Sequence, residues 1–131
     1  MKIYLAGRFE DQFPLREVSY MLIMQKHEIA STWLWSDDSY ETEKEKASIA
    51  LKDYRDIIAC DILVLYSHLG EPLPTRQAHS TELGLALAMG KRVIIVGVKT
   101  DNVFHYLPSI EYCPTWGNLM QLLMQDCIIK E

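Results

Sequence analysis

The sequence has little of what several large classes of protein depend on. Only three of its 131 residues are cysteine, with no CxxC pair, and its four histidines lie at no zinc-ligand spacing. No apolar run approaches the ~20 residues of a membrane helix, and the N-terminus lacks the features of a signal peptide. We therefore expect a soluble, cytoplasmic protein without a metal site and without a membrane partner.

Glycine-rich phosphate loops are also missing. The loop after the first predicted strand contains Gly7 as its one glycine, which excludes a P-loop and a dinucleotide fingerprint. The same loop lacks the Ser and Thr run of a flavodoxin, and no G-x-S-x-G hydrolase motif is present. We expect no cofactor. The net charge of −5 argues against a nucleic acid polymer as partner, although backbone N–H groups can still hold one nucleotide.

What the sequence does have is a regular alternation of apolar runs and amphipathic segments. Hydrophobic residues make up 49% of the chain, enough for the core of a single domain over 1–131. The patterns predict strands at 2–6, 28–33, 61–66, 92–98 and 110–113, and helices at 14–26, 44–59, between Ser80 and Gly90, and from a Thr115 cap to about 128. This order predicts an α/β fold, a flavodoxin-like three-layer sandwich with helices on both faces of a parallel five-stranded sheet of order 2-1-3-4-5.

Ligands of such sheets bind beyond the carboxyl ends of the strands, at the switch point of strand order. Four segments are predicted to converge there. They are the loop after the first strand, the end of the second strand, the loop that leads to Glu82, and the loop after the fourth strand. Their candidate binding residues are Gly7, Arg8, Phe9, Trp33 and Asn102.

Glu82 is the most informative of the polar residues. It lies in the predicted first turn of a helix that is otherwise apolar nearly all round, within the block 79–98. A carboxylate in a first turn is favoured by the helix dipole, which is one interpretation. A buried helix at the ligand edge also suits a functional carboxylate, and the pattern alone leaves both interpretations open.

Two other polar residues have a similar double interpretation. Asp53 borders the apolar stripe of the second helix, which suits a functional residue. Alternatively, Asp53 and Asp56 are solvated charges near Lys52 and Arg55. Tyr4 lies in the predicted central strand, where a tyrosine is usually core but can aim its hydroxyl at a carboxylate of the next element.

Four stretches together resemble a known family. KIYLAGRF, KDYRDIIACDILVLY, ELGLALAMGKRVIIVG and DNVFHYLP occur in this order over residues 2–108. They are similar to motifs of the nucleoside 2-deoxyribosyltransferase family and of its nucleotide N-glycosidase relatives. The resemblance implies cleavage of the N-glycosidic bond of a (deoxy)nucleoside or its 5′-monophosphate, with transfer of the sugar to another free nucleobase.

The resemblance also implies a role for individual residues. Glu82 would be the nucleophile that forms a covalent glycosyl intermediate, and Tyr4 would orient it. Asp53 would contact the nucleobase and protonate it as it leaves, and Phe9 would stack on it. Asn102 would reach the substrate of a neighbouring subunit, which implies a homodimer or a higher homo-oligomer.

The chain departs from the family pattern just before Glu82. Many relatives have an acidic residue where this chain has Arg76, and the run 76–80 replaces a Gly-Gly-Arg-His sequence. Arg8, His79 and Ser80 are therefore candidates for binding a 5′-phosphate. Two alternatives remain: hydrolysis to free base and sugar, and a non-catalytic nucleotide-binding module.

Overall fold

The computed structural model describes residues 1–37, 41–68 and 77–130, with side chains up to residue 126. Its five strands form one parallel sheet in the order β2-β1-β3-β4-β5, which confirms the predicted topology and fold class. The strands are β1 (Lys2–Ala6), β2 (Glu28–Ile29), β3 (Ile62–Ser67), β4 (Arg92–Gly97) and β5 (Glu111–Cys113).

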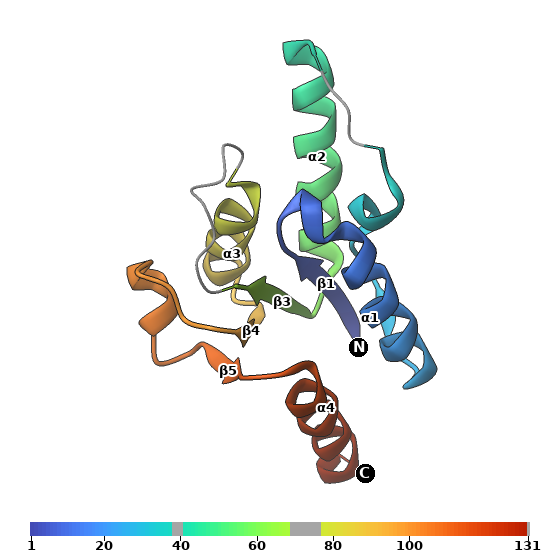
Figure 1. Cartoon of the computed structure of the whole chain (residues 1–131), viewed down its shortest axis with the longest axis vertical. Coiled ribbons are helices and arrows are strands. Elements are labelled where there is room, and N and C mark those ends of the chain that lie inside the picture. The colour runs from blue at the N-terminus through green and yellow to red at the C-terminus, as the bar shows by residue number, and fades with distance from the viewer. Residues whose placement is uncertain (38–40, 69–76, 131) are drawn as a thin grey trace.

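Four α-helices cover the two faces of the sheet. They are α1 (Gln12–Met24), α2 (Glu43–Ala59), α3 (Ala78–Ala88) and α4 (Trp116–Lys130). Helices α2 and α3 pack together on one face, and α1 and α4 lie over the other (Figure 1). No helix among the described residues is long and apolar enough to cross a membrane.

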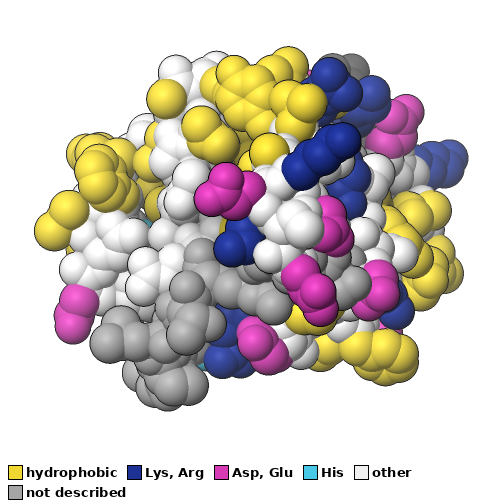
Figure 2. Space-filling view, turned by 90° about the horizontal axis from the view of Figure 1, so that it is seen from above, with side chains coloured by type: hydrophobic (Ala, Val, Ile, Leu, Met, Phe, Trp, Pro, Cys, Tyr) yellow, Lys and Arg dark blue, Asp and Glu magenta, His cyan; other side chains and the backbone are white. Residues whose placement is uncertain are grey.

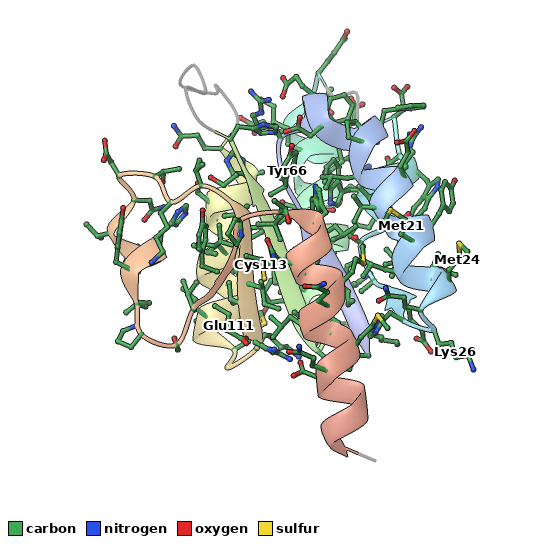
Figure 3. The ribbon with its side chains drawn as sticks, turned by 60° about the horizontal axis from the view of Figure 1, so that its bottom comes forward. Met21, Met24, Lys26, Tyr66, Glu111 and Cys113 are labelled. Carbon is green, nitrogen blue, oxygen red and sulfur yellow. The ribbon has the colours of Figure 1, made fainter. Side chains whose placement is uncertain are left out.

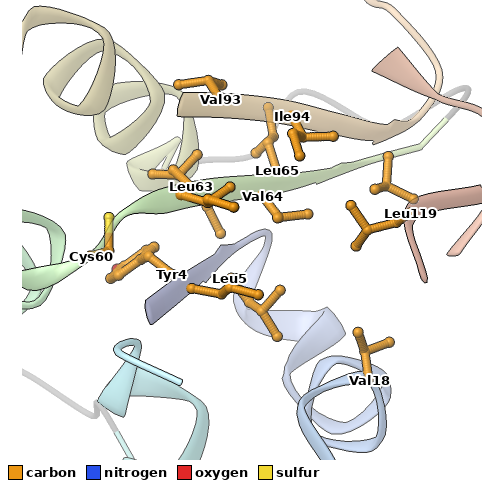
Figure 4. Packing of buried hydrophobic residues seen from close by; sticks show 14 of the residues in the cluster. Tyr4, Leu5, Val18, Cys60, Leu63, Val64, Leu65, Val93, Ile94 and Leu119 are labelled. Carbon is orange, nitrogen blue, oxygen red and sulfur yellow. The ribbon is translucent and has the colours of Figure 1, made fainter. Parts of the chain in front are cut away.

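The core lies between the sheet and both helix layers because the central strands are apolar nearly throughout. Side chains of β1 and β3 alternate between the two faces, so Tyr4 and Leu63 point one way and Leu5 and Val64 point the other (Figure 4). Tyr4 is completely buried. The alternation directs its hydroxyl toward the α2–α3 layer.

The second strand is shorter than the sequence predicted. We expected a strand over 28–33, but β2 ends at Ile29 and a 3-10 helix, η2 (Thr32–Trp35), follows. Side chains replace the missing strand ladder: the Leu5 N–H donates to Ser31 Oγ at 3.0 Å, and the Trp33 indole N–H donates to the Leu5 carbonyl at 2.7 Å. Because the backbone groups of Leu5 are satisfied in this way, a longer β2 is unnecessary.

The helix starts also differ from the predictions in detail. Helix α1 begins at Gln12, after the 3-10 helix η1 (Phe9–Asp11), so Pro14 is not its first residue. Helix α3 begins at Ala78 with Gln77 as its N-cap in the left-handed region (φ 47°), so Ser80 is not the cap. Gly90 does follow the end of α3 with φ 73°, as predicted.

The predicted Thr115 cap is present, because the Thr115 hydroxyl accepts from the Asn118 N–H at 3.1 Å. Helix α2 starts with a capping box formed by Thr42 and Glu45. Most of the loop that leads to Glu82, between β3 and α3, lies outside the described residues. On the face in Figure 2, basic and acidic side chains are interleaved, with no large patch of one sign among the described residues.

Candidate active site

The structure brings Tyr4, Asp53 and Glu82 together from three elements, β1, α2 and α3. Each has an oxygen atom that solvent does not reach: Tyr4 Oη, Asp53 Oδ1 and Glu82 Oε2. Burial raises the pKa of Tyr4 far above its ordinary value, and the charges of Glu82 and Asp53 raise it further. Tyr4 therefore remains a neutral phenol, which can donate a hydrogen bond to a carboxylate.

Among the side chains, Glu82 has the largest electrostatic effect on that hydroxyl. No described residue lies at ordinary hydrogen-bond geometry to Tyr4 Oη, yet Glu82 is near enough for hydrogen bonding to add to the rise of the tyrosine pKa. That the phenol orients the carboxylate of Glu82 remains a prediction.

The position of Glu82 weakens the dipole interpretation. The side chain is only 8% exposed, and it is the fifth residue of α3 rather than a member of its first turn, contrary to our expectation. The favourable effect of a helix dipole falls off within the first turn. A buried carboxylate beyond that turn needs another explanation, and Tyr4 and Asp53 provide its immediate surroundings.

The two aspartates of α2 have different environments, although they are one helical turn apart. Asp56 accepts hydrogen bonds from the Thr32 N–H at 3.0 Å and the Thr32 hydroxyl at 2.7 Å, so it ties α2 to η2. Asp53 instead places a buried oxygen near Tyr4. The contacts of Asp56 give it a structural role, and the functional role of Asp53 remains a prediction.

The loop after β1 carries three of the predicted binding residues. Gly7 has little room for a side chain, because a Cβ atom there would lie 2.9 Å from Leu15 Cδ1. Phe9 is 36% exposed at the start of η1. The Arg8 guanidinium binds Asp11, through Nε at 3.1 Å and Nη2 at 3.4 Å.

Sequence reasoning missed Asp11 and its second partner, His68. Asp11 is 6% exposed, and its Oδ2 lies 2.9 Å from His68 Nε2. One signal was available: Arg8 and His68 follow the ends of β1 and β3, which are neighbours in the sheet. Polar residues after adjacent parallel strands meet at one edge.

Trp33 lies at the same edge but is 6% exposed, and its indole N–H is used by the Leu5 carbonyl. Any substrate contact by Trp33 must come from its ring, and its binding role remains a prediction. Phe13 and Trp35, the other aromatic residues near this region, are 67% and 46% exposed. They do not join the buried group.

Asn102 is placed by a local hydrogen-bond network. It is the N-cap of the 3-10 helix η3 (Val103–Tyr106), and its Oδ1 accepts from the Phe104 N–H at 3.0 Å. Its own N–H donates to Thr100 Oγ1 at 3.2 Å. The contact of Asn102 with a substrate remains a prediction.

The first turn of α3 lies near η3. Burial lowers the pKa of His105, and the charge of His79 lowers it further, so the two histidines are neighbours. His79 and Ser80 are half-buried, and their role with a phosphate remains a prediction. Among residues 1–37, 41–68 and 77–130, no three His, Cys, Asp or Glu side chains gather as a metal ion would require.

Comparison with known proteins finds matches by structure but not by sequence. No protein-family profile matches the chain, and no curated protein matches it. The structure is similar to that of a 2-deoxyribosyltransferase from Bacillus psychrosaccharolyticus, with a TM-score of 0.68 and 21% identity over 91% of this chain and 90% of that one. It is also similar to a CMP N-glycosidase from Clostridium botulinum, with a TM-score of 0.62 and 17% identity over 94% and 98% of the two chains. The likeness expected from the four motifs is thereby confirmed at the level of the fold.

Proposed function

We propose that this protein cleaves the N-glycosidic bond of a (deoxy)nucleoside or a nucleoside 5′-monophosphate and transfers the (deoxy)ribosyl group to another nucleobase. The observation that carries the proposal is that Tyr4, Asp53 and Glu82 lie together, each with an oxygen atom shielded from solvent. The two structural relatives, a 2-deoxyribosyltransferase and a CMP N-glycosidase by their names, support the same reaction class.

The proposed mechanism has two displacements at the anomeric carbon. Glu82 attacks C1′ as the C–N bond breaks, and the bond's electron pair leaves with the base, which takes a proton from Asp53. The neutral Tyr4 hydroxyl donates to Glu82 and holds it in line. A second base then attacks C1′, passes its proton to Asp53 and releases Glu82, so the product retains its configuration.

Burial makes Glu82 suitable for this role. A carboxylate shielded from water stabilises the positive charge that develops on the sugar more strongly than a solvated one does. Phe9, half-exposed in the first loop, would stack on the base, and the backbone at Gly7 and the ring of Trp33 would line its other side. Arg8, His79 and Ser80 would contact a 5′-phosphate where the substrate carries one.

We further propose that the protein acts as a homodimer or a higher homo-oligomer, with Asn102 extending into the site of a neighbouring subunit. Asn102 is followed by exposed apolar side chains: Val103, Phe104 and Tyr106 are 74%, 57% and 58% exposed. Contiguous exposed apolar surface of this kind marks interaction sites. Burial between subunits would cover this surface and bring the amide of Asn102 toward the partner.

The proposal is tested by incubating the protein with nucleosides and 5′-monophosphates and measuring free base by chromatography. Glu82→Gln keeps the shape of the side chain and should abolish turnover, whereas Glu111→Gln, on β5, should remain active. Near-normal rates in Glu82→Gln would refute the nucleophile assignment. Adding a second base distinguishes transfer, which yields the exchanged nucleoside, from the alternative of hydrolysis.

The alternative of another class is a non-catalytic nucleotide-binding module. Binding alone does not require buried carboxylate oxygens on Glu82 and Asp53 beside a buried tyrosine, because burying charge is costly. Tight binding of nucleotides with no base release over hours would favour the binding module.

A further inference from the structure

A buried carboxylate outside the catalytic group joins two loops at the carboxyl edge of the sheet. Asp11 is 6% exposed, and it pairs with Arg8 from the loop after β1 and with His68 directly after β3. The partner side chains are more exposed, at 21% and 27%. The cluster therefore consists of a buried carboxylate and two partly exposed side chains that pair with it.

This cluster closes the turn that presents Phe9. The Asp11 N–H donates to the Arg8 carbonyl at 2.9 Å, so backbone and side chains of the two residues both close the turn around Phe9 and Glu10. A buried charge is stable only when it is paired, and each ordered side chain costs conformational entropy. The ionic pairing of Asp11 offsets that cost and keeps the turn in one conformation.

His68 connects the turn to the core. Its ring packs edge-on against Tyr66 with centroids 4.1 Å apart, and Tyr66 in turn lies 5.2 Å from the ring of Trp116 on α4. Asp11 is thus joined through His68 to strand β3 and helix α4. The His68 contact thus adds a link from η1 to another strand, whereas Arg8 belongs to the same loop as Asp11.

We propose that Asp11 is a positioning residue, which pairs with Arg8 and His68 to fix the turn that holds Phe9 against the nucleobase. The inference rests on the proposed function, since it gives Phe9 a base to bind. It predicts that Asp11 acts on substrate binding and leaves the chemistry at Glu82 largely unchanged.

The direct test is Asp11→Asn, which keeps the size of the side chain and removes its charge. KM for the nucleoside should rise about tenfold, as expected for one lost charge-assisted hydrogen bond, while kcat changes less than about threefold. His68→Gln should shift KM in the same direction and keeps the test valid if Asp11→Asn fails to fold. If Asp11 acts through Phe9, the effects of Asp11→Asn and Phe9→Leu on kcat/KM will be less than multiplicative.

Glu111→Gln is the matched control. Glu111 pairs with Arg92 through two contacts of 2.5 and 2.7 Å, and Arg92 opens β4 at the amino end of the sheet. Figure 3 shows Glu111 lower on the sheet than Tyr66. This variant loses a more exposed ion pair at the other end of the sheet, so its melting temperature should fall slightly while KM remains at the wild-type value.

Two results would overturn the inference: an unchanged KM in both Asp11→Asn and His68→Gln, or fully multiplicative effects with Phe9→Leu. A wild-type protein that releases no base would instead refute the proposed function. In that case NMR can still test whether Asp11 positions the turn, by measuring how fast the Arg8 Nε–H exchanges with solvent. Slow exchange in the wild type that becomes fast in Asp11→Asn supports the positioning role. Equal exchange rates in the two proteins contradict it.

Discussion

Removing the hydroxyl of Tyr4 should affect stability and activity in opposite directions. Tyr4 is fully buried, and no described residue lies at ordinary hydrogen-bond geometry to its Oη. Burying a hydroxyl without a good partner costs about 1–3 kcal/mol. Tyr4→Phe removes that cost and leaves the ring packing intact, although Glu82 loses a neighbouring donor.

The net effect on folding should be small and favourable. We expect a free energy of unfolding equal to that of the wild type or about 1 kcal/mol higher, which raises Tm by roughly 3–5 °C at this chain length. Activity should fall, because the carboxylate loses a hydrogen bond worth about 1.5–3 kcal/mol in the transition state. This corresponds to a decrease of about 10- to 150-fold in kcat with KM nearly unchanged.

Thermal melts and base-release kinetics on the same preparations test both halves of the prediction. Leu63→Ala is the packing control, since Leu63 pairs with Tyr4 in the sheet and is also fully buried. The free energy of unfolding of Leu63→Ala should be about 2–5 kcal/mol lower than that of the wild type, because the substitution leaves a cavity in the core. A Tyr4→Phe variant with a Tm several degrees lower and wild-type kcat would refute the reasoning, because the hydroxyl would then be structural.

Two further predictions concern backbone geometry and pH. Gly97→Ala should lower the free energy of unfolding by more than about 3 kcal/mol, because Gly97 has φ 116° and a Cβ atom there would lie 1.9 Å from the Ser67 carbonyl oxygen. Gly84→Ala has open space around the new methyl group and should raise the free energy of unfolding by up to ~1 kcal/mol. Urea unfolding measures both variants, and equal effects would contradict the geometry. Burial lowers the pKa of His105 in the folded state, so the unfolded chain takes up the proton first and stability should fall as pH drops below about 6.5. Unfolding curves at pH 7.5 and 5.5 should show this loss of stability in the wild type and a smaller loss in His105→Asn. An identical change of stability with pH in both proteins would exclude His105 as its cause.

Much of the fold was predictable because the apolar runs are long and their order is regular. The failures have local physical causes. The strand expected over 28–33 stops early because Ser31 and Trp33 satisfy the backbone of Leu5 with side chains, an arrangement that β-propensity does not register. Serine is a residue type that often caps helices, but Ser80 lies inside α3. The helix begins at Ala78, and its N-cap Gln77 is in the left-handed conformation.

The candidate site was predictable in part. Glu82 and Tyr4 were identified from the sequence and both are buried in the structure, while their catalytic roles remain proposals. Asp53 and Asp56 share one side of a helix three residues apart, so periodicity cannot tell them apart and only tertiary contacts do. Asp11 was missed because its pairing with His68 spans 57 residues of sequence, and no local spacing records it.

The central claim is that Glu82 forms a covalent bond with the sugar. The most direct measurement is mass spectrometry of peptides from enzyme quenched during turnover of a deoxynucleoside. The proposed mechanism predicts a deoxyribosyl adduct on the peptide that contains Glu82 and none on Glu82→Gln. Steady turnover with an adduct on another residue, or with no adduct and an inverted product, would contradict it.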